Sequence, residues 1–103
     1  MGLDYVDLYL IHAPLPLKFV PMETRYPPGL VYEPDDKGMG QVIEDEVPIQ
    51  ETWTVMEECV GEGLAKHIGV SCFPTALLRD VCAYAKVKPA CNQVEIHPFC
   101  TQP

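Results

Sequence analysis

A piece of a parallel β/α barrel is the fold class that this sequence predicts, and three observations lead to it. Short apolar runs of strand character alternate with helical segments, in the order strand, loop, helix, strand, helix, strand. Each apolar run ends on polar residues, as in such barrels, because buried strands hold polar groups only where they open into loops. The connections from helix to strand are short, as in parallel β/α units.

The length of the chain, 103 residues, is well below the roughly 250 residues of a closed eight-stranded barrel. Only two complete strand–helix units and one further strand can be counted. We therefore expect residues 1–103 to form a partial (β/α)8 barrel domain, incomplete at both ends. An independent domain rarely begins and ends beside central strands, whose backbone groups need partners.

The first predicted strand is Tyr5–Ile11, which is almost entirely apolar. Asp7 is the exception, and it either faces the barrel interior or caps a neighbouring element. From Ala13 to Val47 neither helical nor strand periodicity persists, and prolines and glycines interrupt the segment. The sequence therefore predicts a long irregular loop after the first strand.

The first predicted helix begins at Pro48, where the missing N–H costs nothing. Its apolar residues recur at spacings of three and four and share one face, which we interpret as core: Ile49, Trp53, Met56 and Val60. Gly63 is the expected left-handed residue at its end.

The second predicted strand is Lys66–Val70, and Ser71 follows it. Pro74 starts the second helix, which carries its own apolar face: Leu77, Val81 and Tyr84. Pro89 ends this helix, and Ala90–Ile96 is the third predicted strand.

The composition excludes several classes of protein. Seven Lys and Arg against fifteen Asp and Glu give a net charge of −8, which argues against nucleic acid or an anionic membrane as partner. Five cysteines without a Cys-x-x-Cys pair predict reduced thiols in a cytoplasmic protein and no metal centre. No secretory signal occurs, nor an apolar run of roughly 18 residues. The sequence gives no indication of oligomeric state.

Three polar side chains at strand ends are the candidate site residues. His12 follows the first strand, where its imidazole can donate to a substrate carbonyl or merely satisfy a backbone carbonyl. Ser71 and Gln93 stand at equivalent points of the next two strands, and a hydroxyl with an amide can bind another planar amide. Alternatively, Ser71 caps the helix near Pro74. Neither a phosphate-binding glycine loop nor a hydrolase nucleophile elbow occurs.

Four motifs, in register over nearly the whole chain, resemble the aldo-keto reductase family. They are Leu3-Asp-Tyr-Val-Asp-Leu-Tyr-Leu-Ile-His12-x-Pro14, Trp53-x-x-Met-Glu-Glu58, Gly63-x-x-Lys-x-Ile-Gly-Val-Ser71-x-Phe73 and Lys88-Pro-Ala-x-Asn-Gln-Val-Glu-Ile-His-Pro98. Lys18–Glu23 and Tyr26–Gly29 look like the long loop of its xylose reductase branch.

The resemblance implies an eight-stranded barrel, of which this chain supplies about strands 4 to 6 with the two intervening helices. It implies binding of NADPH, or NADH, and hydride transfer between the nicotinamide and an aldehyde, a ketone or an aldose sugar such as xylose. His12 matches the family's active-site histidine, which orients the carbonyl. Ser71 and Gln93 match residues that hydrogen-bond the nicotinamide carboxamide.

The sequence departs from the family at two positions. Cys72 stands where the family usually has an asparagine that completes the carboxamide clamp, so this fourth site residue has a weak donor. Ala13 stands where the family tends to place an aromatic wall of the substrate pocket, which would widen the site.

The family's general-acid tyrosine, with its aspartate and lysine partners, belongs to earlier strands, and none of the five tyrosines here matches it. We therefore expect an NAD(P)H-dependent oxidoreductase by resemblance, with this chain by itself inactive. The alternatives are a non-catalytic interaction protein on a reductase scaffold and an inactive truncated product.

Overall fold

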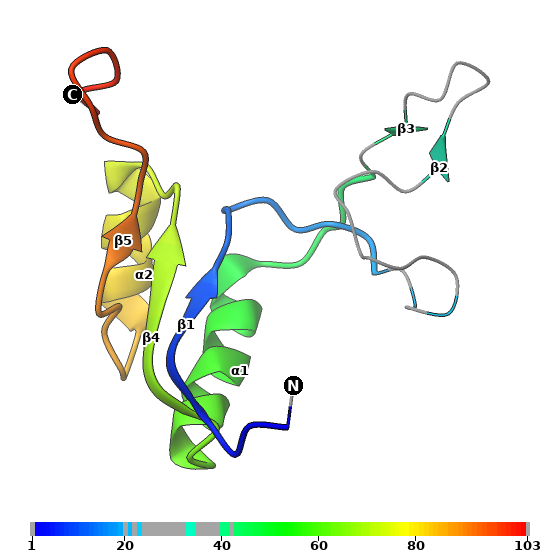
Figure 1. The fold of residues 1–103 in the computed structure, drawn as a ribbon, viewed down its shortest axis with the longest axis vertical. Helices are drawn as coiled ribbons and strands as arrows, with labels where there is room; N and C mark the ends of the chain where they lie inside the picture. The colour runs from blue at the N-terminus through cyan, green and yellow to red at the C-terminus, as the bar shows by residue number, and fades with distance from the viewer. Residues whose placement is uncertain are drawn as a thin grey trace. The chain divides into compact units, whose positions relative to one another are not determined.

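The chain is seen in a computed structural model that describes residues 2–19, 21, 23, 33–34, 40–41 and 43–102. The chain divides into two compact units, one of Met1–Pro14 with Pro48–Pro103 and one of Leu15–Val47. The first unit contains, in chain order, β1 (Val6–Ile11), α1 (Ile49–Gly61), β4 (Ala65–Ser71), α2 (Thr75–Tyr84) and β5 (Asn92–Gln93) (Figure 1).

The strands of the first unit form one sheet in the order β1-β4-β5, and both neighbouring pairs are parallel. The register runs from Val6 opposite Ala65 to Ile11 opposite Val70, and Ser71 lies opposite Gln93. This is the parallel arrangement that the alternation of strands and helices predicts. It brings the carboxyl ends of all three strands to one edge of the sheet.

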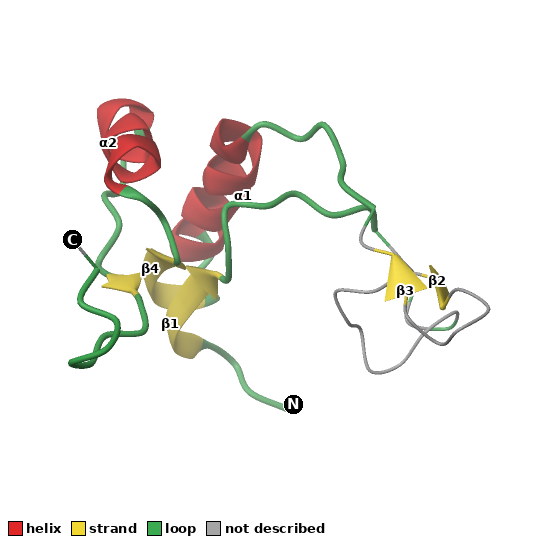
Figure 2. Cartoon of the chain, turned by 90° about the horizontal axis from the view of Figure 1, so that it is seen from above, coloured by secondary structure: helices red, strands yellow, loops and turns green. Residues whose placement is uncertain are grey.

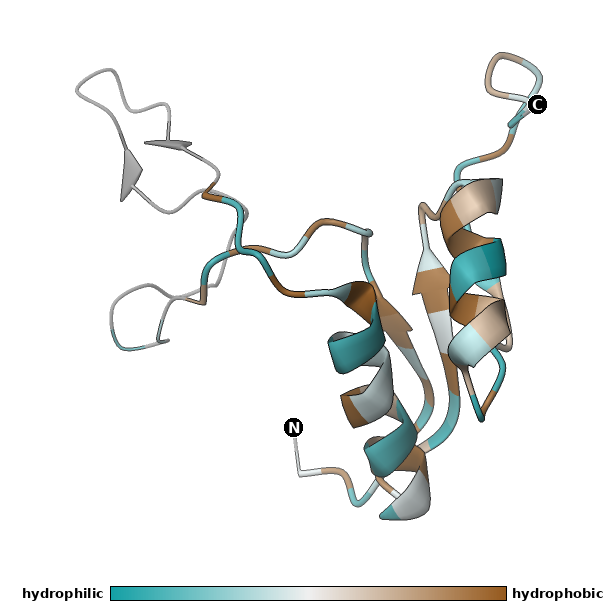
Figure 3. Ribbon diagram, turned by 180° about the vertical axis from the view of Figure 1, so that it is seen from behind, coloured by the Kyte–Doolittle hydropathy of each residue, from teal (hydrophilic) through white to brown (hydrophobic). Residues whose placement is uncertain are grey.

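Both helices pack on the same face of this sheet (Figure 2). Between helices and sheet lies one apolar core, which consists of Trp53, Met56, Ala65, Ile68, Val70, Phe73, Val81 and Ala85. Figure 3 shows apolar residues running through both the strands and the adjoining helices of this unit. The interpretation of Trp53 and Met56 as core residues is therefore confirmed.

Helix α1 begins and ends where its sequence predicts. Pro48 is the extended residue just before it, and its carbonyl accepts the N–H of Glu51 at 3.0 Å. At the other end Gly63 has a φ of +74°, a conformation that costs glycine little, and its N–H donates to the Val60 carbonyl at 3.1 Å. This turn sends the chain directly into β4.

Strand β5 is shorter than the predicted Ala90–Ile96 and covers only Asn92–Gln93. It pairs with β4 on one side, and no strand of the described residues borders its other side. Beyond it the chain turns back at His97 and Cys100, whose backbone groups bond each other in both directions. Strand β4 ends at Ser71, which lies opposite Gln93, so residues 94–96 have no β4 residues with which to pair.

One side-chain question left open by the sequence is answered in the first unit. Asp7 neither faces the interior nor caps another element, because its Oδ1 accepts a hydrogen bond of 2.7 Å from Nζ of Lys66 on the sheet surface.

In the described part of the chain, neither helix is long and apolar enough to cross a bilayer.

The second unit contains two very short strands where the sequence predicts no regular structure. β2 (Glu33–Pro34) and β3 (Gly40–Gln41) pair antiparallel. The N–H of Lys18 also donates to the Ile43 carbonyl at 3.0 Å. Pairing over two residues is too short to leave a periodic pattern in the sequence. The loop motif Tyr26–Gly29 lies outside the described residues.

Candidate active site

The carboxyl ends of β1, β4 and β5 carry the three predicted strand-end residues in one row. Ser71 lies opposite Gln93 in the β4–β5 register. Ile11 lies opposite Val70 in the β1–β4 register, and His12 and Ser71 are the residues that follow this pair. Residues in one row of parallel strands point to the same face, so an imidazole, a hydroxyl and a carboxamide meet at one rim.

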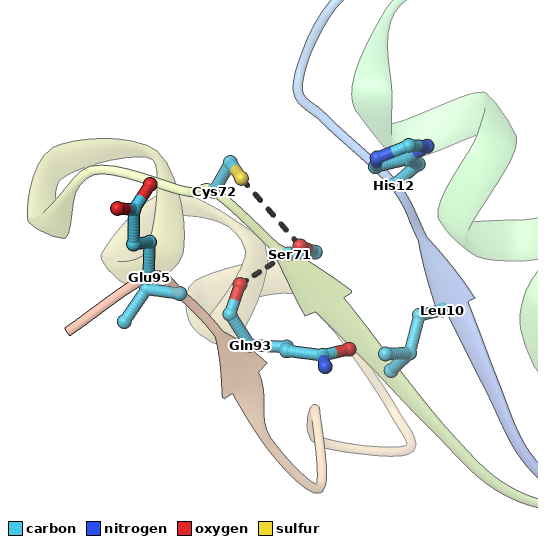
Figure 4. A pocket seen from close by; sticks show the side chains of 7 residues that line it. Leu10, His12, Ser71, Cys72, Gln93 and Glu95 are labelled. Atoms are coloured by element: carbon cyan, nitrogen blue, oxygen red, sulfur yellow. Dashed lines mark hydrogen bonds between the residues drawn. The ribbon is translucent and has the colours of Figure 1, made fainter.

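A cavity of about 550 Å³ opens at this rim (Figure 4). Its lining includes all four predicted site residues and three that the sequence did not single out: Leu10, His12, Ser71, Cys72, Gln93, Val94 and Glu95. The volume falls in the usual range of small-molecule sites, about 300–1,000 Å³.

Ser71 is the buried polar residue of the site, with 8% of its surface exposed. Its hydroxyl donates to the backbone carbonyl of Gln93 at 2.8 Å and lies 3.5 Å from the Cys72 sulfur. It does not cap helix α2, because Pro74 is the residue before that helix and no side chain caps it. Its single proton is committed to Gln93, which leaves its oxygen as an acceptor towards the cavity.

The backbone and the side chain of Gln93 have different roles. Its backbone carbonyl accepts both the Ser71 hydroxyl and, at 3.0 Å, the N–H of Cys72. Its side-chain amide points towards Leu10 and lines the cavity (Figure 4). The backbone thus fixes the strand end, while the amide presents a donor and an acceptor to the cavity.

Cys72 occupies a position with unusual backbone geometry. Its φ is +58°, in the left-handed region that asparagine tolerates better than most residues other than glycine. Its side chain is exposed and lines the cavity. The family resemblance leads one to expect asparagine at this position. Asparagine tolerates the left-handed backbone better than cysteine does, and its amide is a stronger hydrogen-bond donor than the Cys72 thiol.

His12 is exposed at the mouth of the cavity, where its ring projects from the end of β1 (Figure 4). Within the described residues no hydrogen bond ties its ring to a backbone carbonyl, which was the alternative interpretation of this residue. The imidazole is therefore available to a ligand in the cavity.

One of the additional lining residues follows from strand alternation, since Leu10 precedes His12 by two residues at the end of β1. Glu95 lies beyond the end of β5 and lines the cavity from the segment that follows it. Glu95 Oε1 lies 2.7 Å from Nε2 of His97. Since the Phe99 N–H donates to Nδ1 of His97 at 3.2 Å, Nε2 carries the proton that Glu95 accepts.

Gly69 on β4 lies close to both Leu10 and the backbone before β5. A Cβ added there would lie 2.8 Å from Cδ2 of Leu10 and 2.9 Å from the Cys91 carbonyl oxygen. Only a residue without a side chain lets Leu10 and the backbone before β5 come this close to β4.

Among the described residues, no three His, Cys, Asp or Glu side chains gather as metal ligands would.

Comparison with known proteins matches the whole chain, residues 1–103, to the aldo/keto reductase family. The chain belongs to this family. It is 54% identical over 103 residues to the NAD(P)H-dependent D-xylose reductase of Candida tenuis, covering 100% of this chain and 31% of that protein. It is 49% identical over 102 residues to an NADPH-dependent aldose reductase of Saccharomyces cerevisiae, covering 99% of this chain and 31% of that protein.

Solved structures give the same family and the barrel fold. The aldose reductase of Giardia lamblia matches with a TM-score of 0.72 and 45% identity, over 93% of this chain and 29% of that one. The aldose reductase of Schistosoma japonicum matches with a TM-score of 0.75 and 41% identity, over 92% of this chain and 28% of that one. The predicted fold class, a segment of a (β/α)8 barrel, is confirmed, and the chain spans just under a third of the length of these relatives.

Proposed function

We propose that this chain supplies the carbonyl-orienting and nicotinamide-holding part of an NAD(P)H-dependent reductase that converts aldehydes, ketones or aldose sugars such as xylose into alcohols. The observation that carries the proposal is the row of His12, Ser71 and Gln93 on one cavity. The relatives named as xylose and aldose reductases support the nicotinamide cofactor and the class of substrate.

The donor set of the cavity fits a nicotinamide carboxamide. Such a group offers two N–H donors and one carbonyl acceptor in a plane. The Ser71 oxygen has a lone pair free for an N–H, because its proton goes to the Gln93 backbone. The Gln93 side chain supplies the complementary donor and acceptor, and Cys72 adds a weak thiol contact at the same edge. Ser71, Gln93 and Cys72 would therefore hold this part of the cofactor.

When bound there, the nicotinamide would supply a hydride to a carbonyl carbon. His12 contributes the other half of the arrangement, since its N–H can donate to the carbonyl oxygen and withdraw electron density from the reacting carbon. The hydroxyl and amide fix the plane of the ring relative to this imidazole. Ala13, which is half-buried next to His12, leaves room beside the substrate.

The proton donor of the full reaction is proposed to come from outside these 103 residues. None of the described tyrosines, Tyr5, Tyr9 and Tyr84, lines the cavity. We expect the isolated chain to leave NADPH unoxidised in the presence of xylose.

The proposed partner is a small carbonyl compound, rather than a nucleic acid or a membrane. The five free cysteines support a reducing, cytoplasmic setting.

The test is a chimera in which residues 1–103 replace the matching segment of the Candida tenuis enzyme, which is 54% identical over that length. We expect the chimera to oxidise NADPH or NADH with xylose or another aldehyde. His12→Ala should lower kcat by at least about 100-fold. The matched control is His67→Ala, because His67 is also an exposed histidine and does not line the cavity.

A chimera that folds and binds NADPH but reduces no carbonyl would contradict the proposal and favour the non-catalytic scaffold. Equal activity of the His12→Ala and His67→Ala chimeras would contradict the role given to His12.

A further inference from the structure

The loop between α2 and β5 is held by two side chains of the preceding helix, α1. The Trp53 indole N–H donates to the Val87 carbonyl at 3.2 Å, across 34 residues of sequence. Oε1 of Glu57 accepts the N–H of Lys86 at 2.7 Å and the N–H of Val87 at 2.9 Å. Trp53 and Glu57 are one helical turn apart on the same face, and we call this pair the α1 clamp.

The clamp satisfies three polar backbone groups of a segment that belongs to no helix or strand. Two successive N–H groups converge on one carboxylate oxygen, which is a favourable way to bind an anion. The indole N–H donates to a carbonyl of the same loop, and it belongs to Trp53, a residue that is only 1% exposed. The next residue of the helix, Glu58, is exposed and enters none of these bonds.

From the clamp the chain reaches Gln93 through a short ladder. Three residues after Val87, the Ala90 N–H donates to the Ile68 carbonyl at 2.8 Å. The Cys91 and Gln93 carbonyls then accept the N–H groups of Val70 and Cys72, each at 3.0 Å. Strand β5 itself has only two residues, so the fixed loop is a large part of what holds its place.

We propose that Trp53 and Glu57 are positioning residues, which set the place of β5 on β4 and thereby the reach of the Gln93 amide into the cavity. They touch neither the cavity nor any ligand in it. That the Gln93 amide serves a cofactor rests on the proposed function, whereas the placing of β5 by Trp53 and Glu57 does not. An experiment can therefore contradict one of these two claims and leave the other standing.

The experiment is amide hydrogen exchange on the 103-residue chain with Glu57→Ala, Glu57→Gln and Glu58→Ala. The reporters for β5 are the N–H groups of Val70, Cys72 and Ala90, and the reference for the β1–β4 side is the Val6 N–H, which donates to Leu64. Glu57→Ala removes both bonds and should speed exchange at the β5 reporters by at least about tenfold, with Val6 unchanged.

Glu57→Gln is the rescue variant, because its amide oxygen can still accept both N–H groups, and it should restore most of the protection. Glu58→Ala is the matched control on the same helix and should exchange like the parent chain. The single tryptophan of the sequence, Trp53, gives a second readout, since its emission should shift in Glu57→Ala and not in Glu58→Ala.

Unchanged exchange at the β5 reporters in Glu57→Ala would overturn the proposal. So would an equal loss of protection at Val6, or unfolding of that variant, because Glu57 would then contribute to the stability of the whole unit rather than to the place of β5. None of these readouts needs a nicotinamide, so their outcome is independent of the proposed reductase activity.

Discussion

The two edges of strand β4 are joined to their neighbours in different ways. Along β1, the pairing runs from Val6 opposite Ala65 to Ile11 opposite Val70, so a backbone ladder holds the two strands together. Along β5, only Asn92 and Gln93 lie in the strand, and three backbone bonds join residues 90–93 to β4. The side chains of Ser71 and Asn92 add bonds at the strand, and those of Trp53 and Glu57 add bonds at the loop before it. The contrast teaches that the strand carrying Gln93 relies on side-chain hydrogen bonds in addition to a short backbone ladder, whereas a longer backbone ladder and apolar packing place the strand that carries His12.

The largest effect on stability is expected from Gly69→Ala, which changes the contact of β4 with the backbone before β5. The new methyl group would overlap Leu10 and the Cys91 carbonyl. Overpacking of this kind costs about 1–3 kcal/mol. Urea unfolding followed by Trp53 fluorescence measures it. Gly61→Ala is the matched control, since a Cβ there meets nothing within 4 Å. Equal midpoints for the two variants would contradict the close approach at Gly69.

The next effect separates two adjacent residues of β5. The Asn92 side chain bonds Phe73 twice, with Oδ1 accepting from its N–H at 3.2 Å and Nδ2 donating to its carbonyl at 2.9 Å. Asn92→Ala should lower the unfolding free energy by about 1–2 kcal/mol, while Gln93→Ala should change it by less than about 0.5 kcal/mol, because that side chain faces the cavity. A larger loss of stability from Gln93→Ala would reverse this assignment.

A smaller effect of the opposite sign is expected at Cys72. Cys72→Asn places a residue that tolerates the left-handed region at a φ of +58° and should stabilise the chain by about 0.5 kcal/mol. Cys82→Asn, at an exposed position within α2, is the matched control and should not stabilise. Thermal unfolding of both variants measures the difference, and a lower midpoint for Cys72→Asn would contradict the backbone argument.

The smallest effect belongs to the surface pair of Asp7 and Lys66 across β1 and β4. The hydrogen bond with Asp7, and next the one with Tyr5, raises the pKa of Lys66 above its ordinary value of 10.5. A raised pKa means that the contribution is present below 10.5 and lost as the pH rises through the higher folded value. Lys66→Gln should lower the urea midpoint slightly at neutral pH, and salt should reduce the difference. A large, salt-independent loss would show that the backbone ladder matters less than we infer.

The sequence predicted those parts of the fold that depend on local pattern. Apolar spacing and proline placed α1 and α2, and the polar ends of the strands predicted that His12, Ser71 and Gln93 would share a rim. The alternation of strand side chains could have added Leu10, which lies two residues before His12.

The contacts that escaped prediction join residues far apart in the chain. Nothing in the pattern around Glu57 distinguishes it from Glu58, yet only Glu57 bonds the loop 29 and 30 residues later. The length of β5 was wrong for a related reason, since it depends on which neighbours pair with that strand rather than on the β propensity of residues 90–96. The hydroxyl of Ser71 likewise had two local interpretations, of which the structure excludes the helix cap, because Pro74 precedes α2 and no side chain caps it.

The proposed function requires above all that Ser71 and Gln93 bind a carboxamide beside His12. The direct measurement compares kcat/KM of the chimera for NADPH and for its reduced 3-acetylpyridine analogue, which lacks the amide N–H donors. We predict a preference for NADPH of about tenfold, which one hydrogen bond can supply, and its loss in Ser71→Ala. A preference that Ser71→Ala leaves unchanged, or no preference in the parent chimera, would contradict the account.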